Sequence, residues 1–396
     1  MSDCRVAGQV SLPTWNKASR MPARYDIVTV TLRIAVLEGI RIIELEGLGP
    51  APFAGMLLAD LGAEVVVIHR RGPQGGTAPL CSLLDRGKKS VELDLKSPDD
   101  VRVLKRLVGT ADGLIEGFRP GVMERLGLGP DALRDCNPRL VYGRVTGWGQ
   151  DGPKSSLAGH DLNYIALSGA LAYASRPGDS PRSPPTLTGD VGGGALYLVA
   201  GMLAGLLRAQ RTGQGTVVDA AIVDGSAHML NLLRTAEAAG LFDRASGKNI
   251  IDGAPWSRCY RCADGGWLAV QCLEPKFYAL FREKLGVDGD AALAQNPDPA
   301  AWPSIAARFE ELIASKSRAE WSAIFDDSDA CAAPVLEPNE AARHPHMAAR
   351  GTWFERDGQL EARAAPRFDG EKPRDPKRPP RRGEHTAEIL ASLETG

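Results

Sequence analysis

The stretch from residue 39 to residue 70 constrains the fold more than any other part of the sequence. It reads GIRIIELEGLGPAPFAGMLLADLGAEVVVIHR. The apolar runs at 40–45 and 64–68 are typical of buried strands, and the pattern at 51–61 between them is typical of an apolar helix. A strand, a helix and a second strand in this order predict a βαβ unit with two parallel strands.

The loop inside this unit differs from a dinucleotide-binding loop. Gly47 and Gly49 supply a G-x-G, but Pro52 stands at the position of the third glycine. The second strand also ends without the acidic residue that would hold a nicotinamide ribose. Its end carries three basic residues instead, His69, Arg70 and Arg71. These residues either contact a phosphate or are solvated charges at a strand end.

Further β/α units follow the first one. KKSVELDLK (88–96) alternates like a strand, and 99–108 has a helical pattern. Residues 111–130 carry another strand into a turn and a helix, and PRLVYGRVTGWGQ (138–150) is a strand that leads into a glycine-rich loop. Alternating strands and helices predict an α/β, Rossmann-like domain: a parallel sheet covered on both faces, with ligands at the carboxyl ends of its strands.

The second half of the chain has a different pattern. Two short strand-like runs flank the turn at 263–266, and helical patterns follow, which predicts a small α+β domain. We therefore divide the chain into an N-terminal extension (1–38), a large α/β domain (39–220), a linker (221–252), a small α+β domain (253–326), a second linker (327–350) and a C-terminal segment that returns to the large domain (351–396).

The N-terminal extension contains basic residues and serines but few acids. This composition is shared by organellar transit peptides, by disordered leaders and by sequences whose true start lies further along, here at Met21. We expect these residues to be disordered and assign them no function.

Charge and hydropathy exclude two classes of partner. The net charge of −2 gives no basic excess for nucleic acid or an anionic membrane. The longest apolar stretch, 196–207, is interrupted by Gly201 and Gly205 and is shorter than the roughly 20 residues that cross a membrane. Seven cysteines form no disulfide framework, and no signal peptide opens the chain. We expect a cytoplasmic protein without membrane insertion.

Two titratable residues are candidates for chemistry. His160 lies in AGHDLNYIALSG, and Asp190 precedes three glycines at the start of an apolar helix. Taken singly, His160 is compatible with a core histidine and Asp190 with a helix N-cap. Taken together, they follow successive elements and are both flanked by glycine. Two bases on either side of a small pocket can invert a carbon acid, because one removes a proton and the other delivers one.

The sequence does not indicate a metal site. Cys259 and Cys262 form a CxxC, with Cys272 nearby, but no second CxxC or neighbouring histidine supplies the fourth ligand of a structural zinc. We interpret the cysteines as residues of a hairpin. Basic residues near strand ends favour a phosphate-bearing ligand instead: Arg70, Arg86, Lys88, Lys89, Lys96, Arg119 and Arg125.

Several motifs, in order from residue 39 to the end, resemble the class III coenzyme A (CoA) transferase superfamily and, within it, the α-methylacyl-CoA racemases. They include GPAPFAGMLLADLGAEVVVI, DRGKKSVELDLK, AGHDLNYIALSG, GDVGGG, EPKFY and GEHTAEIL. The resemblance implies epimerisation of the carbon next to a CoA thioester through an enolate, with no metal or cofactor. The two bases fall on His160 and Asp190, and a glutamate beside the histidine falls on Glu274. A backbone N–H near Asp161 is our candidate donor to the enolate oxygen.

The resemblance also assigns contacts with CoA. They are Arg70, Leu93, Asp94, Leu95, Lys96, Gly117, Phe118, Arg119, Arg125, Gly159, Leu162, Asn163 and Tyr164. Phe118 stands where tyrosine is common, and Arg71 where proline is frequent. Members form interlocked homodimers in which the small domain of one chain closes the site of the other, so Glu274 is expected to reach His160 across chains.

Two alternatives use the same residues. A CoA-transferase of the superfamily would use Asp190 as a nucleophile that attacks the thioester. Transferases generally lack a histidine at the position of His160, whereas removal of a proton from carbon calls for a base that titrates near neutrality. A non-catalytic acyl-CoA-binding protein would have lost the bases, and both are present. The sequence therefore favours a racemase acting on 2-methyl-branched acyl-CoA thioesters.

Overall fold

The structure is a computed structural model that describes residues 35–72, 82–173, 179–240, 247–372 and 374–394. Residues 1–34, most of the expected N-terminal extension, lie outside the described residues. Within residues 35–396, the chain forms a large sheet, a small sheet and a separate hairpin.

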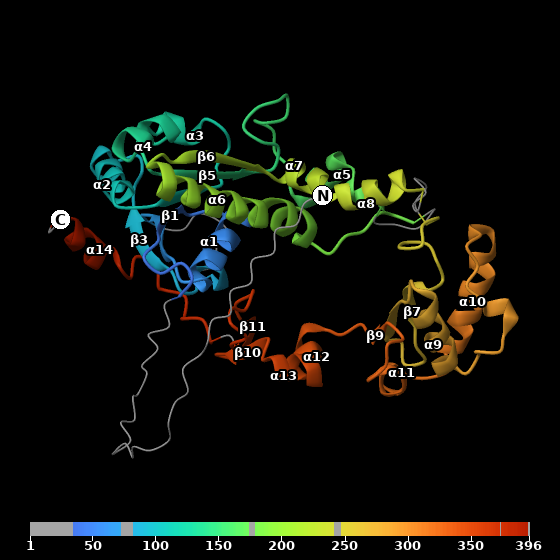
Figure 1. Ribbon diagram of the computed structural model, residues 1–396. Helices are drawn as coiled ribbons and strands as arrows, with labels where there is room; N and C mark the ends of the chain where they lie inside the picture. The colour runs from blue at the N-terminus through green and yellow to red at the C-terminus, as the bar shows by residue number, and fades with distance from the viewer. Residues whose placement is uncertain (1–34, 73–81, 174–178, 241–246, 373, 395–396) are drawn as a thin grey trace, which may run out of the picture. The chain divides into compact units, whose positions relative to one another are not determined.

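A six-stranded sheet forms the centre of the large domain (Figure 1). Its order is β3-β2-β1-β4-β5-β6, and all neighbouring strands are parallel. The strands are β1 (Arg41–Leu45), β2 (Glu64–Arg70), β3 (Lys89–Leu93), β4 (Gly113–Glu116), β5 (Val141–Thr146) and β6 (Thr216–Ala221). This confirms the α/β fold. The chain leaves β1 and β4 in opposite directions, so a crevice is expected at their carboxyl ends.

Helices cover both faces of the sheet because its strands are apolar on both. Ile42 and Val65 pack in one core with α1 (Pro50–Asp60) and α6 (Leu196–Thr212). The next residues along each strand, Ile43 and Val66, pack on the opposite face. The helices there are α2 (Pro98–Gly109), α4 (Pro130–Cys136) and α14 (Thr386–Glu394). The alternation follows from the two-residue period of a strand.

The helical segment Leu187–Thr212 is longer than the sequence indicates, because a π-helix (Leu187–Ala195) runs directly into α6. It has 26 residues and contains an 18-residue window with a mean hydropathy of 1.5, so it could cross a membrane by length and composition alone. However, α6 packs on the sheet: a Cβ on Gly143 would lie only 2.6 Å from the sulfur of Met202. Such packing is usual for a core helix of a globular domain.

Four shorter helices complete this domain. They are α3 (Val122–Arg125), α5 (Asp161–Ser168), α7 (Ile222–Met229) and α8 (Asn231–Ala238). Figure 1 shows α5 and α7 close together, and α7 begins directly after β6. These two helices therefore lie near the carboxyl end of β6.

The small domain has an antiparallel sheet of β7 (Ser257–Arg261), β8 (Trp267–Gln271) and β9 (Ala332–Pro334). Its helices are α9 (Pro275–Leu285), α10 (Trp302–Ile313) and α11 (Arg318–Phe325), and its core is largely aromatic. From sequence this domain ends at 326, but β9 lies beyond that boundary. A three-residue strand containing proline has no recognisable alternation.

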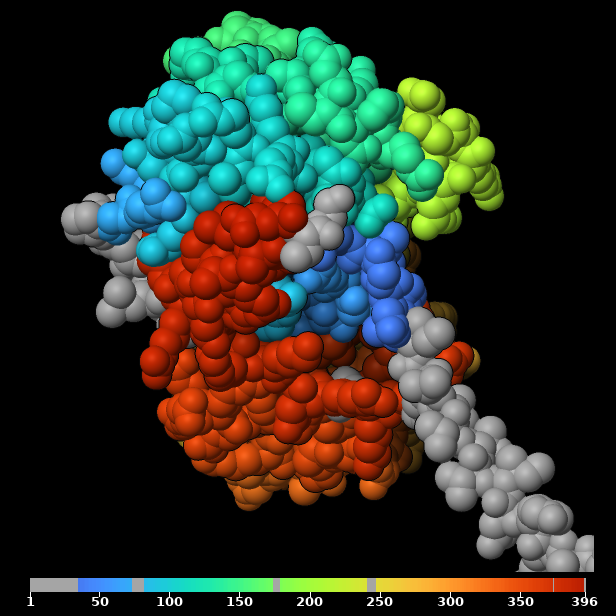
Figure 2. Space-filling view, turned by 90° about the vertical axis from the view of Figure 1, so that its left-hand side faces the viewer, coloured from blue at the N-terminus to red at the C-terminus, as the bar shows by residue number. Residues whose placement is uncertain are grey.

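The C-terminal part returns to the large domain. After α12 (Pro338–Arg343), α13 (Pro345–Arg350) and the hairpin of β10 (Trp353–Arg356) and β11 (Gln359–Ala362), the chain runs along β3. His385 N–H donates to Ser90 O at 2.9 Å, and Glu92 N–H donates to the Thr386 hydroxyl at 3.1 Å. Figure 2 shows these red residues against the blue and cyan ones. The tail thus covers an edge strand.

Candidate active site

Asp190 lies at the crevice between β1 and β4. A Cβ on Gly49, the residue before α1, would lie 3.8 Å from Oδ2 of Asp190. Gly49 has a φ of 74°, which favours glycine. The fold therefore places one candidate base at the usual ligand site of a doubly wound sheet.

The backbone around Asp190 is unusual. Asp190 belongs to the π-helix, and the residue before that helix, Thr186, has a φ of 60°. The N-cap of this helix is Thr186, so the alternative interpretation of Asp190 as a helix N-cap is wrong. The glycines after Asp190 make room for α7: a Cβ on Gly193 would lie 2.4 Å from the Ser226 hydroxyl. A π-helix and a positive φ are frequent at functional sites.

Asp161 connects the segments that carry the two candidate bases. Its Oδ1 accepts hydrogen bonds from the backbone N–H groups of Gly189 and Asp190, both at 2.8 Å. Asp161 is the first residue of α5, directly after His160, and is buried. From sequence only its backbone N–H was a candidate. The role of its carboxylate was missed, because the partners are 28 and 29 residues away.

The environment of Asp190 brings its titration close to neutrality. The pKa of Asp190 is raised from 3.8 to about 6: burial is the largest cause, the negative charge of Asp161 adds to it, and His160 partly offsets both. His160 is therefore close enough to interact with Asp190 electrostatically. A carboxyl group with a pKa near neutrality can both remove and deliver a proton.

The loop that carries His160 is fixed by aromatic packing. The Tyr164 ring lies 4.7 Å from Trp148 in an edge-to-face arrangement, and its hydroxyl donates to Gly159 O. The His160 N–H donates to Oδ1 of Asn163 at 3.0 Å. Gly159, Asn163 and Tyr164, assigned to CoA from sequence, thus have structural contacts of their own. The exposed side of His160 remains accessible to a ligand.

A cavity of about 580 Å³ opens at the carboxyl ends of the first four strands. Seven predicted CoA contacts line it: Arg70, Leu93, Asp94, Leu95, Lys96, Phe118 and Arg125. Next to Phe118, Gly117 packs on α1, since a Cβ there would lie 3.3 Å from Ala51. The cavity and Asp190 therefore lie near the same end of α1.

The other predicted contacts are not in this lining. Among the described residues, Gly117, Arg119, Gly159, Leu162, Asn163 and Tyr164 lie outside it. His69, named from sequence as a candidate for a phosphate contact, also lines the cavity. The lining further contains residues that sequence missed: Leu45, Glu46, Ile68, Val122, Leu126 and Arg382. Arg382 could not be found from local sequence, because it is 336 residues from Glu46, its partner.

Six of the seven basic residues suggested for phosphate binding separate into two groups, and the seventh, Arg119, lies outside the cavity lining. Arg86, Lys88 and Lys89 precede or begin β3, at the amino end of the strand, so they do not face the ligand edge. Each forms an ion pair instead: Arg86 with Asp60 at 2.5 Å, Lys88 with Glu44 at 2.7 Å and Lys89 with Glu64 at 2.9 Å. In contrast, the side chains of Arg70, Lys96 and Arg125 have no ion pair within the described parts of the chain and line the cavity. Such cations suit phosphate groups.

Glu274 precedes α9 in the small domain and is exposed. Its backbone oxygen accepts from the N–H groups of Phe277 and Tyr278, while its carboxylate does not cap the helix. No hydrogen bond joins Glu274 to His160 within the described chain. Across the same residues, no three His, Cys, Asp or Glu side chains gather as a metal site would require.

The chain is similar in sequence and in structure to known proteins. The CoA-transferase family III model matches residues 37–386. The α-methylacyl-CoA racemase of Mus musculus is 44% identical over 359 residues, which cover 90% of this chain and 92% of that protein. The succinyl-CoA–D-citramalate CoA-transferase of Chloroflexus aurantiacus is 31% identical, covering 79% and 82%. A crystal structure of a CAIB/BAIF family protein from Brucella suis, 26% identical, covers 91% of this chain and all of that one, with a TM-score of 0.76.

Proposed function

Since this chain belongs to CoA-transferase family III, we propose that it is a racemase that inverts the α-carbon of 2-methyl-branched acyl-CoA thioesters. One observation carries the proposal: Asp190, with a pKa raised to about 6, lies at the crevice within electrostatic reach of His160. The identity to a named racemase supports it. No cofactor enters the proposed mechanism.

The reaction needs two proton transfers. One base removes the α-proton, and the electron pair of the C–H bond forms the enolate, whose charge resides on the thioester oxygen. The other group then delivers a proton to the opposite face of the same carbon, which regenerates the thioester with inverted configuration. Asp190 and His160 exchange these roles between the two epimers. The backbone N–H of Asp161, at the start of α5, is the proposed donor to the enolate oxygen.

The cavity is the proposed binding site for the nucleotide part of CoA. Arg70, Lys96 and Arg125 would bind its phosphates, while Leu95 and Phe118 supply apolar contact for the base. The other contacts assigned by resemblance, Gly117, Arg119, Gly159, Leu162, Asn163 and Tyr164, lead from this cavity toward His160.

We also propose an interlocked homodimer in which Glu274 of one chain contacts His160 of the other. The carboxylate of Glu274 is exposed and does not cap α9, so it is available to a partner. A carboxylate on the far ring nitrogen would fix the imidazole tautomer. A cytoplasmic location is part of the proposal, because the five cysteines in the described residues are free.

A CoA-transferase is the second candidate, because Asp190 could also act as a nucleophile on the thioester. A relative with 31% identity is named as a CoA-transferase. The test is incubation of one epimer of a 2-methylacyl-CoA in heavy water without an acceptor acid. A racemase incorporates deuterium at the α-carbon and loses optical purity. Enzyme that stays inert until a free carboxylate is added would contradict the proposal and support the transferase.

The pH dependence follows from the pKa of Asp190. Deprotonation of the epimer whose proton Asp190 removes needs the ionised carboxylate, so its kcat/KM should fall as the pH drops through about 6. In Asp161→Asn the amide oxygen still accepts both N–H groups, but the charge that raises the pKa is gone. The fall should therefore move to lower pH. A pH profile with an unchanged midpoint would contradict this coupling.

A further inference from the structure

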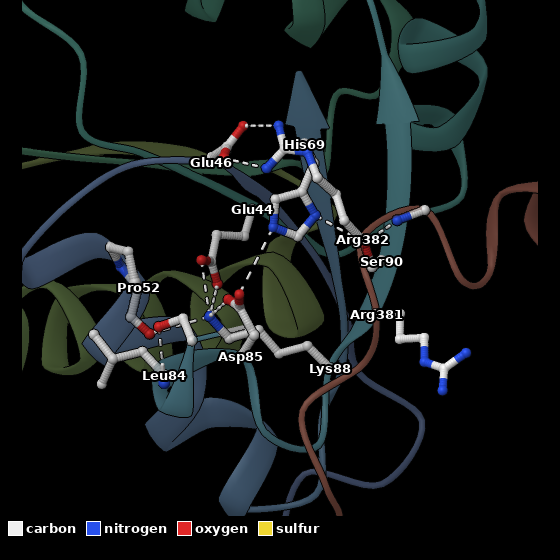
Figure 3. Close-up of polar contacts among 12 residues, drawn as sticks. Glu44, Glu46, Pro52, His69, Leu84, Asp85, Lys88, Ser90, Arg381 and Arg382 are labelled. Atoms are coloured by element: carbon white, nitrogen blue, oxygen red, sulfur yellow. Dashed lines mark hydrogen bonds and ion pairs between the residues drawn. The ribbon is translucent and has the colours of Figure 1, made fainter. Parts of the chain in front are cut away.

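The C-terminal tail brings Arg382 to the carboxyl ends of the first three strands (Figure 3). The Arg382 guanidinium binds Glu46 with two hydrogen bonds, of 2.6 Å and 2.8 Å. It also donates to the backbone oxygen of Arg70 at 2.6 Å, and its Nε lies 3.3 Å from Glu92. Gly383, the next residue, donates to the Ser90 hydroxyl at 2.8 Å, which holds the tail in place.

These contacts fix the backbone of Arg70 on both sides. Glu46 Oε2, besides binding Arg382, accepts the N–H of Arg70 at 2.8 Å. Arg382 binds the carbonyl of the same residue. The N–H and the C=O of Arg70 are thus both held by one ion pair. The Arg70 side chain, in turn, lines the cavity and has no ion pair with any other described residue.

Arg382 also controls the charge at the cavity wall. Burial raises the pKa of Glu46, but hydrogen bonds from Arg382 and from the Arg70 N–H outweigh it, so the net pKa is lowered. Glu46 is therefore a carboxylate that lines the cavity. Without Arg382, this negative charge would be unpaired and would repel a phosphate.

The donors of Arg382 are largely used by the protein. Both terminal nitrogens are bonded to Glu46, and one of them also binds the Arg70 carbonyl. The side chain is 15% exposed, against 29% for Glu46. Arg382 is thus poorly placed to bind a ligand directly and well placed to orient a neighbour that does.

We propose that Arg382 is a positioning residue for CoA binding. Through its ion pair with Glu46, it orients Arg70 toward the phosphates and neutralises the carboxylate beside them. This inference rests on the proposed function, since it assumes that the cavity binds the nucleotide part of CoA. It acts on affinity for CoA and leaves the proton transfers at Asp190 and His160 unchanged.

The test combines direct binding with kinetics. In Arg382→Met, the dissociation constant for free CoA, measured by calorimetry, and the KM for a 2-methylacyl-CoA should both rise about tenfold or more, because the partly buried Glu46 carboxylate is left unpaired beside the phosphates. The kcat should stay within about twofold, since the acid and base are untouched. A matching thioester of pantetheine, which has no nucleotide phosphates, should react equally well with variant and wild type.

Two further variants separate orientation from general effects. Arg381→Met removes the same charge from the neighbouring position, whose side chain points away from the cluster in Figure 3, and should change CoA affinity by less than about twofold. The double variant Glu46→Gln/Arg382→Met removes the repelling carboxylate and should regain only part of the lost affinity, because the Arg70 carbonyl still lacks its donor.

Each outcome has a defined meaning. Wild type that does not bind CoA would contradict the proposed function, and the inference would fail with it. Wild type that binds CoA, with an Arg382→Met variant of equal affinity, would overturn the inference alone. A fall in kcat and in melting temperature at unchanged CoA affinity would show a merely structural tail and overturn it as well. So would a double variant with the full affinity of wild type, because the orientation of Arg70 would then contribute nothing to CoA binding.

Discussion

Asp190→Asn and His160→Ala should each slow racemisation by about 10²–10⁴-fold. The two variants should differ in proton exchange, because each loses exchange from a different epimer. Each variant loses the group on one side of the α-carbon. The epimer whose proton faces the remaining group can still exchange it for deuterium, without inversion. Exchange from the other epimer should stop. The measurement is the rate of α-deuterium uptake from heavy water, followed by NMR for each epimer separately.

A matched variant tests whether charge removal alone explains the result. Asp131→Asn changes an exposed aspartate in the first turn of α4 and should leave both exchange rates intact. Loss of exchange from the same epimer in both site variants would contradict opposed bases. Complete inactivity of Asp190→Asn combined with normal turnover of His160→Ala would indicate that Asp190 acts as a nucleophile.

The sheet was predictable because its information is local. Apolar runs at 40–45 and 64–68 flank one helix, and a parallel strand buried on both faces needs little more than such a run. The carboxyl ends of those strands are set by the fold, so residues such as Arg70 and Leu93 could be placed at the ligand edge from their position in the motif.

Long-range polar partners were not predictable, because no local pattern encodes them. Lys88 and Lys89 are neighbours in the same basic motif, yet only Lys88 is fully buried. Its ammonium group contacts Glu44 of β1, which is separated from β3 by β2 in the sheet. Gly55 has a role that depends on the same buried ion pair. A Cβ at Gly55 would lie 1.7 Å from Oε2 of Glu44, so the glycine lets α1 pass over the buried ion pair.

The π-helix at Asp190 was hidden for a different reason. Three successive glycines usually indicate a loop or a close approach to a ligand. Here at least two of them, Gly193 and Gly194, accommodate residues of α7. The residues of α7 that pack against these glycines are more than 25 positions further along the chain, so local sequence does not show the contact.

Lys88→Met should lower the free energy of unfolding by about 3–5 kcal/mol, because it leaves a buried carboxylate without its cation. Lys88 Nζ lies 2.7 Å from Glu44, and it donates to the carbonyl of Pro52 at 3.1 Å (Figure 3). Both side chains of the ion pair are almost fully buried. Urea unfolding of the variant and of wild type, followed by circular dichroism, measures the difference.

The pH dependence of this loss has a definite sign. Burial raises the pKa of Glu44 from 4.5 to about 7, even though the charge of Lys88 lowers it. A raised pKa means that the folded state favours the protonated form of Glu44. The stability that protonated Glu44 contributes is therefore complete below pH 4.5 and is lost as the pH rises through about 7. The Lys88→Met variant should therefore be closest to wild type in acid and furthest from it above neutrality.

Two controls identify the cause of the loss. Lys89→Met removes the adjacent charge, whose side chain is 34% exposed, and should cost less than about 1 kcal/mol. The double variant Glu44→Leu/Lys88→Met replaces the ion pair by apolar groups and should recover much of the stability, because no charge then stays buried alone. If Lys88→Met and Lys89→Met cost the same, the burial of the Glu44–Lys88 pair is not what stabilises this part of the fold.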